Sequence, residues 1–356
     1  MKILIVENGF NDLKKSRIPL GLYFQAIGNE VFYACPDPQE PGITNISMSR
    51  NSLSPIQLIN GFESLYRIEK ENTIDVVLSF RFIPNVLNYM ASFRNRSVKR
   101  VSVITGLGFA FIAGNNSIRT VVQRTLIKIF YRIASRRIQI IAQNPNDLAD
   151  LGVKKGNVVL GSGLKRTNSK ANEVIHTDSL KLLFVGRLLK SKGINTTLSI
   201  FEQLKFRNIS VSLTIAGTID KDNPDSITEI ELSELKSKTG VNYLGFVSEM
   251  DSVYQECNVL LFPSTYREGV PRVILEALKH GLTIVTTDMP GCKETINGNG
   301  YLIREEEGVG GVIEYLLSLD SKKISENNVK SRELFESTFC ADVIYPQYMV
   351  YLSKQI

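Results

Sequence analysis

The densest group of residues that could do chemistry lies between residues 260 and 281. A buried strand is expected to end at residues 263–264, and a polar loop follows it. Pro271 has the fixed φ that suits the first position of a helix, and Gly281 ends that helix. The backbone N–H groups of Gly269 and Val270, with the free donors at the helix start, can bind a phosphate. The spacing therefore predicts a phosphate-binding loop at a helix N-terminus.

Two glutamates accompany this loop. Glu268 comes just before the helix, and Glu276 lies one turn after Arg272 on the same helical face. A diphosphate would repel an adjacent carboxylate, so we expect Glu268 to accept hydrogen bonds from sugar hydroxyls and Glu276 from ribose hydroxyls. The alternative is a solvated loop acid and a surface charge. The residues around Glu276 are mostly apolar, which favours a ligand or partner for an acid there.

Short β-rich apolar runs alternate with helical patterns along the chain, which indicates α/β domains with doubly wound parallel sheets. The first series of expected strands comprises residues 2–6, 31–34, 75–79, 101–104, 138–141 and 157–160. The second comprises residues 180–185, 210–215, 241–244, 258–262 and 282–286. Ligands of such sheets bind at the carboxyl ends of the strands. We therefore expect two domains that face each other across a cleft.

Length and composition agree with two ordinary globular domains, because the chain has 356 residues, of which 43% are hydrophobic and 22% charged. Residues 164–179 are polar and basic, which predicts the linker. The first residues resemble a buried strand more than a signal peptide, and no apolar stretch is long enough to cross a bilayer. We therefore expect a cytoplasmic protein.

Cysteine and histidine usage argues against a metal site. The four cysteines are far apart in sequence and are expected to be core thiols: Cys35, Cys257, Cys292 and Cys340. There are two histidines; His176 lies in the expected linker, and His280 precedes a helix-ending glycine, where capping or exposure is expected.

Residues 157–305 resemble the retaining glycosyltransferases of family 4, which have the GT-B fold of two Rossmann-like domains. Their signature is a Glu-Gly-x-Pro loop followed by Leu-Glu-Ala, with seven residues between the two acids, and it stands here at residues 268–277. Further matching motifs follow in order at residues 184–188, 192–193, 215–217, 245–247, 263–264, 281–285, 290–291, Glu294 and 300–303. An ordered set of this kind is highly specific.

The resemblance assigns roles to individual residues of the second domain. It implies that the catalytic residues are Arg187 and Lys192, on the donor diphosphate, and Glu268, on the donor sugar. The donor-binding residues that it implies are Gly186, Gly217, Phe246, Val247, Gly269, Val270, Pro271, Arg272 and Glu276. Two fixed cations at strand ends can neutralise a leaving diphosphate without a metal ion. The alternative for Arg187 and Lys192 is a pair of solvated loop charges.

In this resemblance the first domain binds the acceptor. Residues 102–109 are similar to a strand and glycine loop of members that act on polyprenyl-diphosphate-linked sugars, although a tight strand-to-helix turn is the alternative. The expected acceptor-side residues are Gly9, Arg17, Thr105, Gly106 and Gly108. Histidines that relatives often carry are absent from residues 14–20 and 78–80. We therefore expect no side-chain general base, and the departing phosphate oxygen would accept the acceptor proton.

Net charge predicts an anionic partner, since the chain carries +6 with a pI near 9.0. Residues 119–137 form a basic helix pattern in which Arg124, Lys128, Arg132 and Arg136 recur every four residues. Apolar residues fill another face of it, namely Val122, Leu126, Ile129, Phe130 and Ile133. Such a helix can rest on anionic headgroups at the inner face of the cell membrane, or it has a core face and a solvated basic face. No motif supports nucleic-acid binding.

The leading hypothesis is a retaining transferase of cell-surface polysaccharide synthesis, such as capsule or O-antigen, with a UDP-hexose or UDP-N-acetylhexosamine donor. Its acceptor would be lipid-linked or a glycan, and it would use no cofactor. The expected domains are residues 1–163 with a C-terminal helix at 341–356, and residues 164–340. One alternative is a catalytically silent sugar-nucleotide-binding partner of a membrane enzyme. Another is a sugar-nucleotide epimerase of the same fold.

Overall fold

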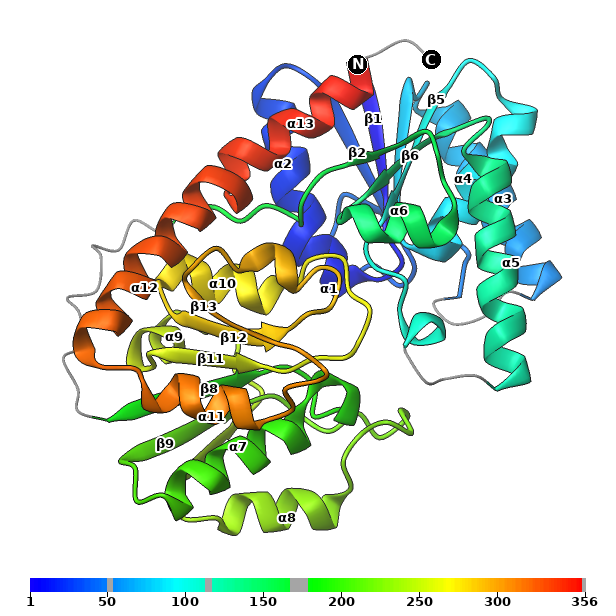
Figure 1. Cartoon of the computed structure of the whole chain (residues 1–356). Coiled ribbons are helices and arrows are strands. Elements are labelled where there is room, and N and C mark those ends of the chain that lie inside the picture. Colours follow the sequence, from blue (N-terminus) through cyan, green and yellow to red (C-terminus); the bar gives the residue numbers. More distant parts are fainter. Residues whose placement is uncertain (50–53, 113–116, 167–178, 354–356) are drawn as a thin grey trace. The chain divides into compact units, whose positions relative to one another are not determined.

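The computed structural model describes residues 1–49, 54–112, 117–166 and 179–353 (Figure 1). The chain divides into two compact units, of which the first combines residues 1–165 with 341–356 and the second comprises residues 166–340. Most of the expected linker, including His176, lies outside the described residues. Each unit is an α/β domain with its own core.

The first unit is built on seven parallel strands in the order β3-β2-β1-β4-β5-β6-β7. These are β1 (Lys2–Val6), β2 (Glu30–Cys35), β3 (Ile43–Asn45), β4 (Val76–Phe80), β5 (Lys99–Ile104), β6 (Gln139–Ala142) and β7 (Gly156–Val158). Strand β1 shows why both faces are covered: Ile3 and Ile5 belong to one buried cluster, and Leu4 and Val6 to another. Alternate side chains of a strand point to opposite faces, so each face has its own core.

Helices α2 (Ile18–Ala26) and α13 (Ala341–Ser353) cover one face of this sheet, where Phe24, Phe80 and Tyr348 are fully buried. The other face carries α3 (Pro55–Glu71) and α4 (Phe82–Arg94) (Figure 1). Helices α5 (Ile118–Ala134) and α6 (Pro145–Leu151) share a further cluster with β6. The short elements of the unit are α1 (Phe10–Asp12), the π-helix η1 (Leu13–Arg17) and the 3-10 turn η2 (Phe109–Phe111).

The second unit has six parallel strands in the order β10-β9-β8-β11-β12-β13. They are β8 (Leu180–Val185), β9 (Val211–Ala216), β10 (Val241–Gly245), β11 (Val259–Phe262), β12 (Thr283–Thr287) and β13 (Gly300–Ile303). Strands β8 and β11 are buried along nearly their whole length, because helices cover both faces of the sheet.

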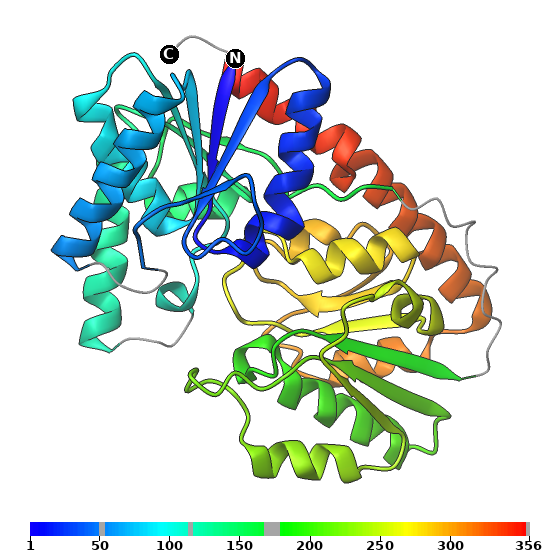
Figure 2. The ribbon, with the colours of Figure 1, turned by 180° about the vertical axis from the view of Figure 1, so that it is seen from behind.

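Helices α7 (Ile194–Phe206), α8 (Glu229–Ser237) and α11 (Gly310–Leu317) share one large core cluster with these strands. Helices α9 (Asp251–Glu256) and α12 (Ser321–Leu334) both pack against α10 (Arg272–His280), and α10 and α12 contact β12. Figures 1 and 2 show α10 and α7 on opposite sides of the sheet. The remaining turns are η3 (Lys190–Lys192), η4 (Lys293–Thr295) and η5 (Phe335–Phe339).

The structure contains all the expected strands, shifted by about two residues at most, and α13 is the expected C-terminal helix, with Pro346 inside it. All four cysteines are buried, which confirms that they are core thiols. Two short strands were not predicted: β3, of three residues, and β13, of four. Each lies at an edge of its sheet, where one side needs no partner and a long apolar run is therefore not required.

Candidate functional site

Glycines shape the carboxyl edge of the second sheet. Gly186 and Gly217 follow the neighbouring strands β8 and β9, and their φ angles are +148° and +154°. A Cβ atom on Gly217 would lie 1.8 Å from the carbonyl oxygen of Gly186, so only glycine allows this approach. The ladder continues beyond the strands, because the Gly217 N–H donates to the Gly245 oxygen at 2.8 Å. These bonds place Arg187 and Phe246 at one edge, where open parallel sheets bind ligands.

The loops after β8 and β11 are locked to each other. Gly193 follows η3 in a left-handed conformation, and a Cβ atom there would lie 2.3 Å from the Pro263 oxygen. The N–H of Thr265 donates to the Ser191 oxygen at 2.8 Å. The N–H of Ser191 donates to a carboxylate oxygen of Asp225 at 3.1 Å. The turn that carries Lys192 therefore has a defined position beside the loop that carries Glu268.

Lys192 and Glu268 form an ion pair between these two loops. Their side chains are 12% and 23% exposed, so the pair is largely shielded from water. The Lys192 ammonium also lies 5.5 Å from the ring centre of Phe262 and 5.1 Å from that of Tyr266, which stabilises the cation. The structure thus brings together the residue expected on the diphosphate and the residue expected on the sugar. Each is held in place by the other.

Arg187 belongs to a separate pair on the same edge. Its guanidinium lies 2.6 Å from a carboxylate oxygen of Asp220, and its side chain is half exposed. Asp220 follows β9 by way of Gly217 and was not identified from the sequence. A signal for it existed, because it stands three residues after a strand-ending glycine. A half-exposed pair of this kind is weak, so Arg187 can exchange Asp220 for another anion at small cost.

Helix α10 begins one residue later than expected. Pro271 is the N-cap, with ψ of 122°, and Arg272 is the first helical residue. The prediction of Pro271 at the first helical position was wrong, because the fixed φ of proline also suits an N-cap whose ψ is extended. Gly281 ends the helix in the left-handed conformation, as predicted.

The Glu276 carboxylate on α10 is held at both oxygens. The Nε of Arg272 lies 2.8 Å from Oε1, one turn away, and the Tyr254 hydroxyl donates to Oε2 at 3.0 Å. Burial and the neighbouring Glu276 charge raise the pKa of Tyr254 well above its ordinary value. The phenol therefore remains a neutral donor at physiological pH, and Glu276 has a fixed orientation with about a quarter of its side chain exposed.

The loop before α10 packs closely against the backbone at Gly291. Gly269 and Val270 are buried, and a Cβ atom on Gly291 would lie 1.9 Å from the Gly269 oxygen.

At the end of β10, Phe246 is 75% exposed and Val247 is half-buried. An aromatic ring so exposed at a strand end offers a flat surface for stacking.

A charged cluster at the carboxyl edge of the first sheet was missed by the sequence analysis. Glu7 follows β1 and is fully buried, and its carboxylate lies 2.8 Å from Arg17 Nε and 3.3 Å from Arg81 Nε. Arg81 follows the neighbouring strand β4 with φ of +71° and also pairs with Asp12 at 2.9 Å. The Arg17 guanidinium lies 3.7 Å from the ring centre of Phe80. Non-glycine residues with positive φ are concentrated at functional sites, which makes Arg81 a candidate beside the predicted Arg17.

The other acceptor-side residues follow β1 and β5. Gly9 has an extended backbone, with φ of −176°, which any residue could adopt. Gly106 and Gly108 have φ angles of +109° and +69°, so both turns after Thr105 favour glycine. All the predicted acceptor-side residues therefore lie at the carboxyl ends of strands or on the segment that follows β1.

His280 is buried, which corrects the expectation of an exposed or capping side chain. Its Nε2 lies 2.9 Å from the Asp251 carboxylate, and its ring stacks on Tyr254 with centres 5.4 Å apart. Burial lowers the pKa of His280 below its ordinary value, against the opposing effect of Asp251. In the described part of the chain, no three His, Cys, Asp or Glu side chains gather in a way that could hold a metal ion.

Most of the predicted apolar face of α5 is exposed, although Phe130 packs against Tyr89. Leu126 is 60% exposed, whereas Tyr131 and Ala134 are buried. Two of its arginines contact backbone oxygens, because Arg124 Nε donates to the Ala110 oxygen at 2.9 Å and Arg132 Nε donates to the Leu151 oxygen at 3.1 Å. Helix α5 therefore has a core face, as the alternative expected, but that face is centred on Tyr131 and Ala134 and leaves most of the predicted apolar face exposed. None of the helices in the described residues is long and apolar enough to cross a bilayer.

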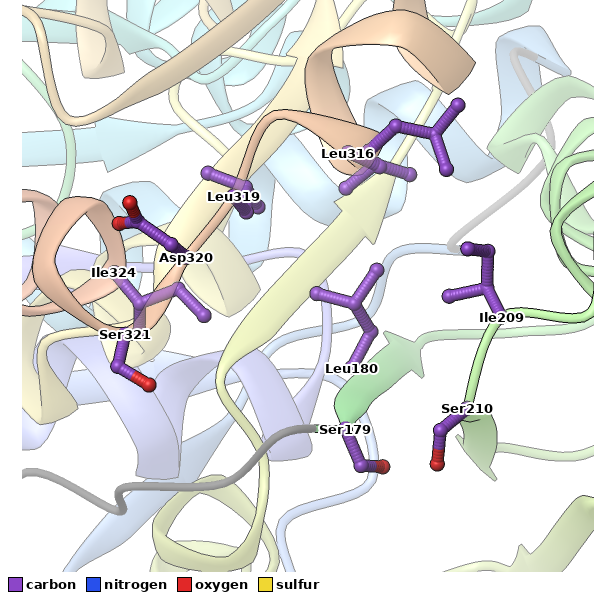
Figure 3. Close-up of a pocket in the computed structure, with 10 residues that line it drawn as sticks. Ser179, Leu180, Ile209, Ser210, Leu316, Leu319, Asp320, Ser321 and Ile324 are labelled. Atoms are coloured by element: carbon purple, nitrogen blue, oxygen red, sulfur yellow. The ribbon is translucent and has the colours of Figure 1, made fainter.

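A cavity of about 310 Å³ lies at the opposite, amino-terminal edge of β8 and β9 (Figure 3). Leu180, Ile209 and Leu316 provide apolar walls, and Asp320 and Ser321 contribute polar groups. None of the predicted site residues lines this cavity. Because parallel sheets bind ligands at the carboxyl edge, we do not assign it to the active site.

Two α/β units, each with a parallel sheet, place the protein in the class of two-domain GT-B proteins. Glycines at the strand ends and charged pairs beside them agree with this class. Solved structures support this class over nearly the whole chain. Anabaena HepE in complex with UDP is 17% identical with a TM-score of 0.78, and the match covers 99% of this chain and 100% of that one. Sucrose-phosphate synthase from Thermosynechococcus elongatus is 16% identical with a TM-score of 0.78, covering 99% and 98%. The predicted GT-B fold is confirmed.

Within this class, residues 165–331 match the family described as glycosyl transferases group 1, and the second unit is a domain of that family. A relative from Campylobacter jejuni, N,N'-diacetylbacillosaminyl-diphospho-undecaprenol alpha-1,3-N-acetylgalactosaminyltransferase, is 26% identical over 71% of this chain and 69% of its own length. The capsular polysaccharide biosynthesis glycosyltransferase CapM of Staphylococcus aureus is 27% identical over 60% of this chain and 58% of its own length. The resemblance to glycosyltransferases is thereby confirmed at the level of this group.

Proposed function

We propose that this protein is a retaining glycosyltransferase of the family 4 type, which transfers a sugar from a nucleotide diphosphate donor without a metal ion. The observation that carries the proposal is the Lys192–Glu268 pair, fixed between two interlocked loops beside the start of α10. One partner is suited to a leaving phosphate and the other to sugar hydroxyls. Their contact means that the two halves of a sugar diphosphate would be bound side by side.

In the proposed mechanism, Lys192 and Arg187 bind the donor diphosphate, and the N–H groups at the start of α10 add partial positive charge. These groups stabilise the negative charge that develops on the leaving diphosphate as the glycosidic bond breaks. Glu268 accepts hydrogen bonds from the sugar, and Glu276, oriented by Tyr254, accepts those of the ribose. The exposed ring of Phe246 stacks on the base.

Retention follows from attack on the face from which the diphosphate departs. The acceptor oxygen forms its bond to the anomeric carbon as the bond to the phosphate oxygen breaks, and that phosphate oxygen takes the acceptor proton. No side-chain base is then needed, and the rate depends on positioning and on charge stabilisation. Arg17 and Arg81, fixed by the buried Glu7, are placed at a strand edge where they can position an acceptor.

Similarity to characterised proteins supports the choice of substrates. HepE was solved in complex with UDP, the name of the Campylobacter relative specifies a diphospho-undecaprenol-linked substrate, and CapM is named for capsular polysaccharide synthesis. We therefore propose a UDP-hexose or UDP-N-acetylhexosamine donor and a lipid-linked or glycan acceptor of cell-surface polysaccharide synthesis. A lipid-linked acceptor implies peripheral contact with the inner face of an anionic membrane, with the protein otherwise in the cytoplasm.

The test compares Lys192→Gln and Glu268→Gln with a matched pair in the same unit, Lys238→Gln and Glu202→Gln, whose side chains are 36% and 53% exposed. Transfer from a panel of UDP-sugars to lipid-linked acceptors is measured beside UDP binding by calorimetry. Glu268→Gln should lower turnover by about 10²- to 10³-fold while UDP still binds. Lys192→Gln should lower turnover and also weaken UDP binding, and the two control variants should change neither quantity.

Full turnover by both site variants would refute the site. If the unaltered protein bound a UDP-sugar but neither transferred nor hydrolysed it with any acceptor, the chain would be a silent partner. Conversion of the donor sugar in the absence of an acceptor would instead indicate an epimerase.

A further inference from the structure

A basic pocket of about 310 Å³ lies in the first unit, away from the predicted acceptor side. It forms where α4 ends, β5 begins and α5 turns into β6, at the amino-terminal edge of the sheet. Four arginines and two polar side chains line it: Arg96, Arg100, Arg136, Arg137, Ser92 and Asn95. The proposed transfer reaction uses none of them.

The floor of the pocket is a buried ion pair. Arg100 and Glu69 are 2% and 0% exposed, and the guanidinium contacts both carboxylate oxygens, at 2.8 and 3.0 Å. The same guanidinium donates to the backbone oxygens of Ala91 and Asn95 at 3.1 and 3.2 Å. This pair is neutral as a whole and fixes the end of α4 against the start of β5.

The wall of the pocket carries positive charge without acidic partners. Arg137 is held by Ser92, whose hydroxyl and carbonyl oxygens lie 2.7 and 2.6 Å from its Nε and Nη2. Arg96 and Arg136 are exposed, and no ion pair links Arg96, Arg136 or Arg137 to an acid among the described residues. With one glutamate against four arginines, the pocket has a surplus of three positive charges. Converging guanidinium groups are suited to bind a phosphate group through paired hydrogen bonds.

An apolar stripe leads to the pocket along α5. Its members are spaced three or four residues apart on one face of the helix and are 46% to 85% exposed: Ile118, Val122, Leu126, Ile129 and Ile133. The next turn of the same face holds Arg136 and Arg137. The helix has 17 residues and is therefore about 25 Å long. Isolated exposed apolar residues are common on protein surfaces, but a continuous stripe of this length indicates a contact surface.

Aromatic contacts connect the pocket to helix α5, which carries the stripe. Phe93, on α4, is 56% exposed and lies 4.2 Å from the Arg137 guanidinium. Its ring packs edge-to-face on Tyr89 at 5.1 Å, and Tyr89 packs on Phe130 of α5 at 5.6 Å. These side chains therefore connect the arginines of the pocket to the helix that carries the stripe.

We propose that the pocket binds the headgroup phosphate of an anionic phospholipid while the α5 stripe enters the boundary of the acyl chains. Stable attachment to a bilayer needs two such contributions, one electrostatic and one apolar, and this surface supplies both. The inference deepens the proposed function, because a lipid-linked acceptor must be met at a membrane. The amino-terminal part of α5 contacts the segment after Gly108, since Arg124 donates to the Ala110 oxygen, so the stripe runs from the acceptor-side loop to the pocket.

The test measures binding of the full chain to vesicles of phosphatidylcholine, with and without phosphatidylglycerol. Arg96→Gln/Arg136→Gln is compared with Lys322→Gln/Lys330→Gln, which removes the same charge from exposed positions of α12 in the second unit. At about 1 kcal/mol per basic residue near an anionic surface, the pocket variant should bind anionic vesicles about 30-fold more weakly. The control should stay within about twofold of the unaltered protein. Leu126→Ser should weaken the binding that remains at high salt, where the electrostatic contribution is screened.

A second arm separates a lipid from a free anion. Inorganic phosphate is titrated against the protein at constant ionic strength, with and without vesicles, and a water-soluble acceptor is used to measure transfer. The proposal expects vesicle binding that depends on Arg96 and Arg136, together with unchanged transfer to the soluble acceptor. Equal vesicle binding by the pocket variant and its control, phosphate binding without vesicle binding, or self-association without vesicle binding would each overturn it. Absence of transfer by the unaltered protein, with vesicle binding intact, would instead count against the proposed function.

Discussion

The buried pair of Glu69 and Arg100 allows a quantitative test of the first unit. Replacing Glu69 by glutamine keeps the shape but leaves the Arg100 guanidinium without a counter-charge at a site that is 2% exposed. The amide also turns one of the two acceptors into a donor that faces a donor. Breaking a buried pair in this way costs about 3–5 kcal/mol. In a unit of this size, each kcal/mol of lost stability lowers the melting temperature by about 2–4 °C. The melting temperature should therefore fall by about 6–20 °C.

Helix α3 also provides a matched control. Glu63, also on α3, pairs with Arg94 at 2.6 Å, but these side chains are 54% and 45% exposed. Glu63→Gln should therefore cost about 0–1 kcal/mol and shift the transition by less than about 4 °C. Differential scanning calorimetry measures both variants. Equal shifts for Glu69→Gln and Glu63→Gln, or a Glu69→Gln cost below about 1 kcal/mol, would contradict the assignment of a desolvated charge pair.

Two further outcomes are expected for the second unit, one for Gly217 and one for His280. Gly217→Ala should cost roughly 3 kcal/mol in urea unfolding and weaken UDP binding, because its Cβ would meet the Gly186 oxygen. The control, Gly28→Ala in the first unit, has a φ of +86° with open space around it and should cost about 1–2 kcal/mol. Similar costs would show that the strand-end contact is unimportant. Burial lowers the pKa of His280, so the unfolded chain binds that proton more readily, and stability should fall as the pH decreases below about 6.5. Thermal unfolding of His280→Gln should show a shallower loss between about pH 7.5 and about pH 5.5; an identical slope would exclude His280 as the source.

The strands of both cores were predictable because burial on two faces leaves an unmistakable pattern. Strand β11 is apolar at every position, and β1 is apolar from Ile3 onward. Strand β3 has the sequence Ile-Thr-Asn and pairs only along β2, so its sequence resembles that of a loop. For α5 the periodicity predicted the helix but not its buried face, because Tyr131 and Leu126 lie on different faces and both are hydrophobic.

For the site, the sequence predicted residues but not their partners. Glu268 and Glu276 were identified from their local sequence and the family resemblance, because a loop and a helix start are local structures. The contact of Lys192 with Glu268 joins residues 76 positions apart and depends on β8 and β11 being neighbours in the sheet. Glu7 and Arg81 were missed for the same reason, since their proximity follows from the pairing of β1 with β4.

The position of α13 ties the order of synthesis to the order of folding. This helix completes the core of the first unit around Phe24 and Phe80, although it is made after the entire second unit. During translation, the second unit can therefore close first, while part of the first sheet stays uncovered. The emerging chain thus carries its second unit in finished form before the first unit has a complete interior. A chaperone would be needed at that stage, while the interior is exposed.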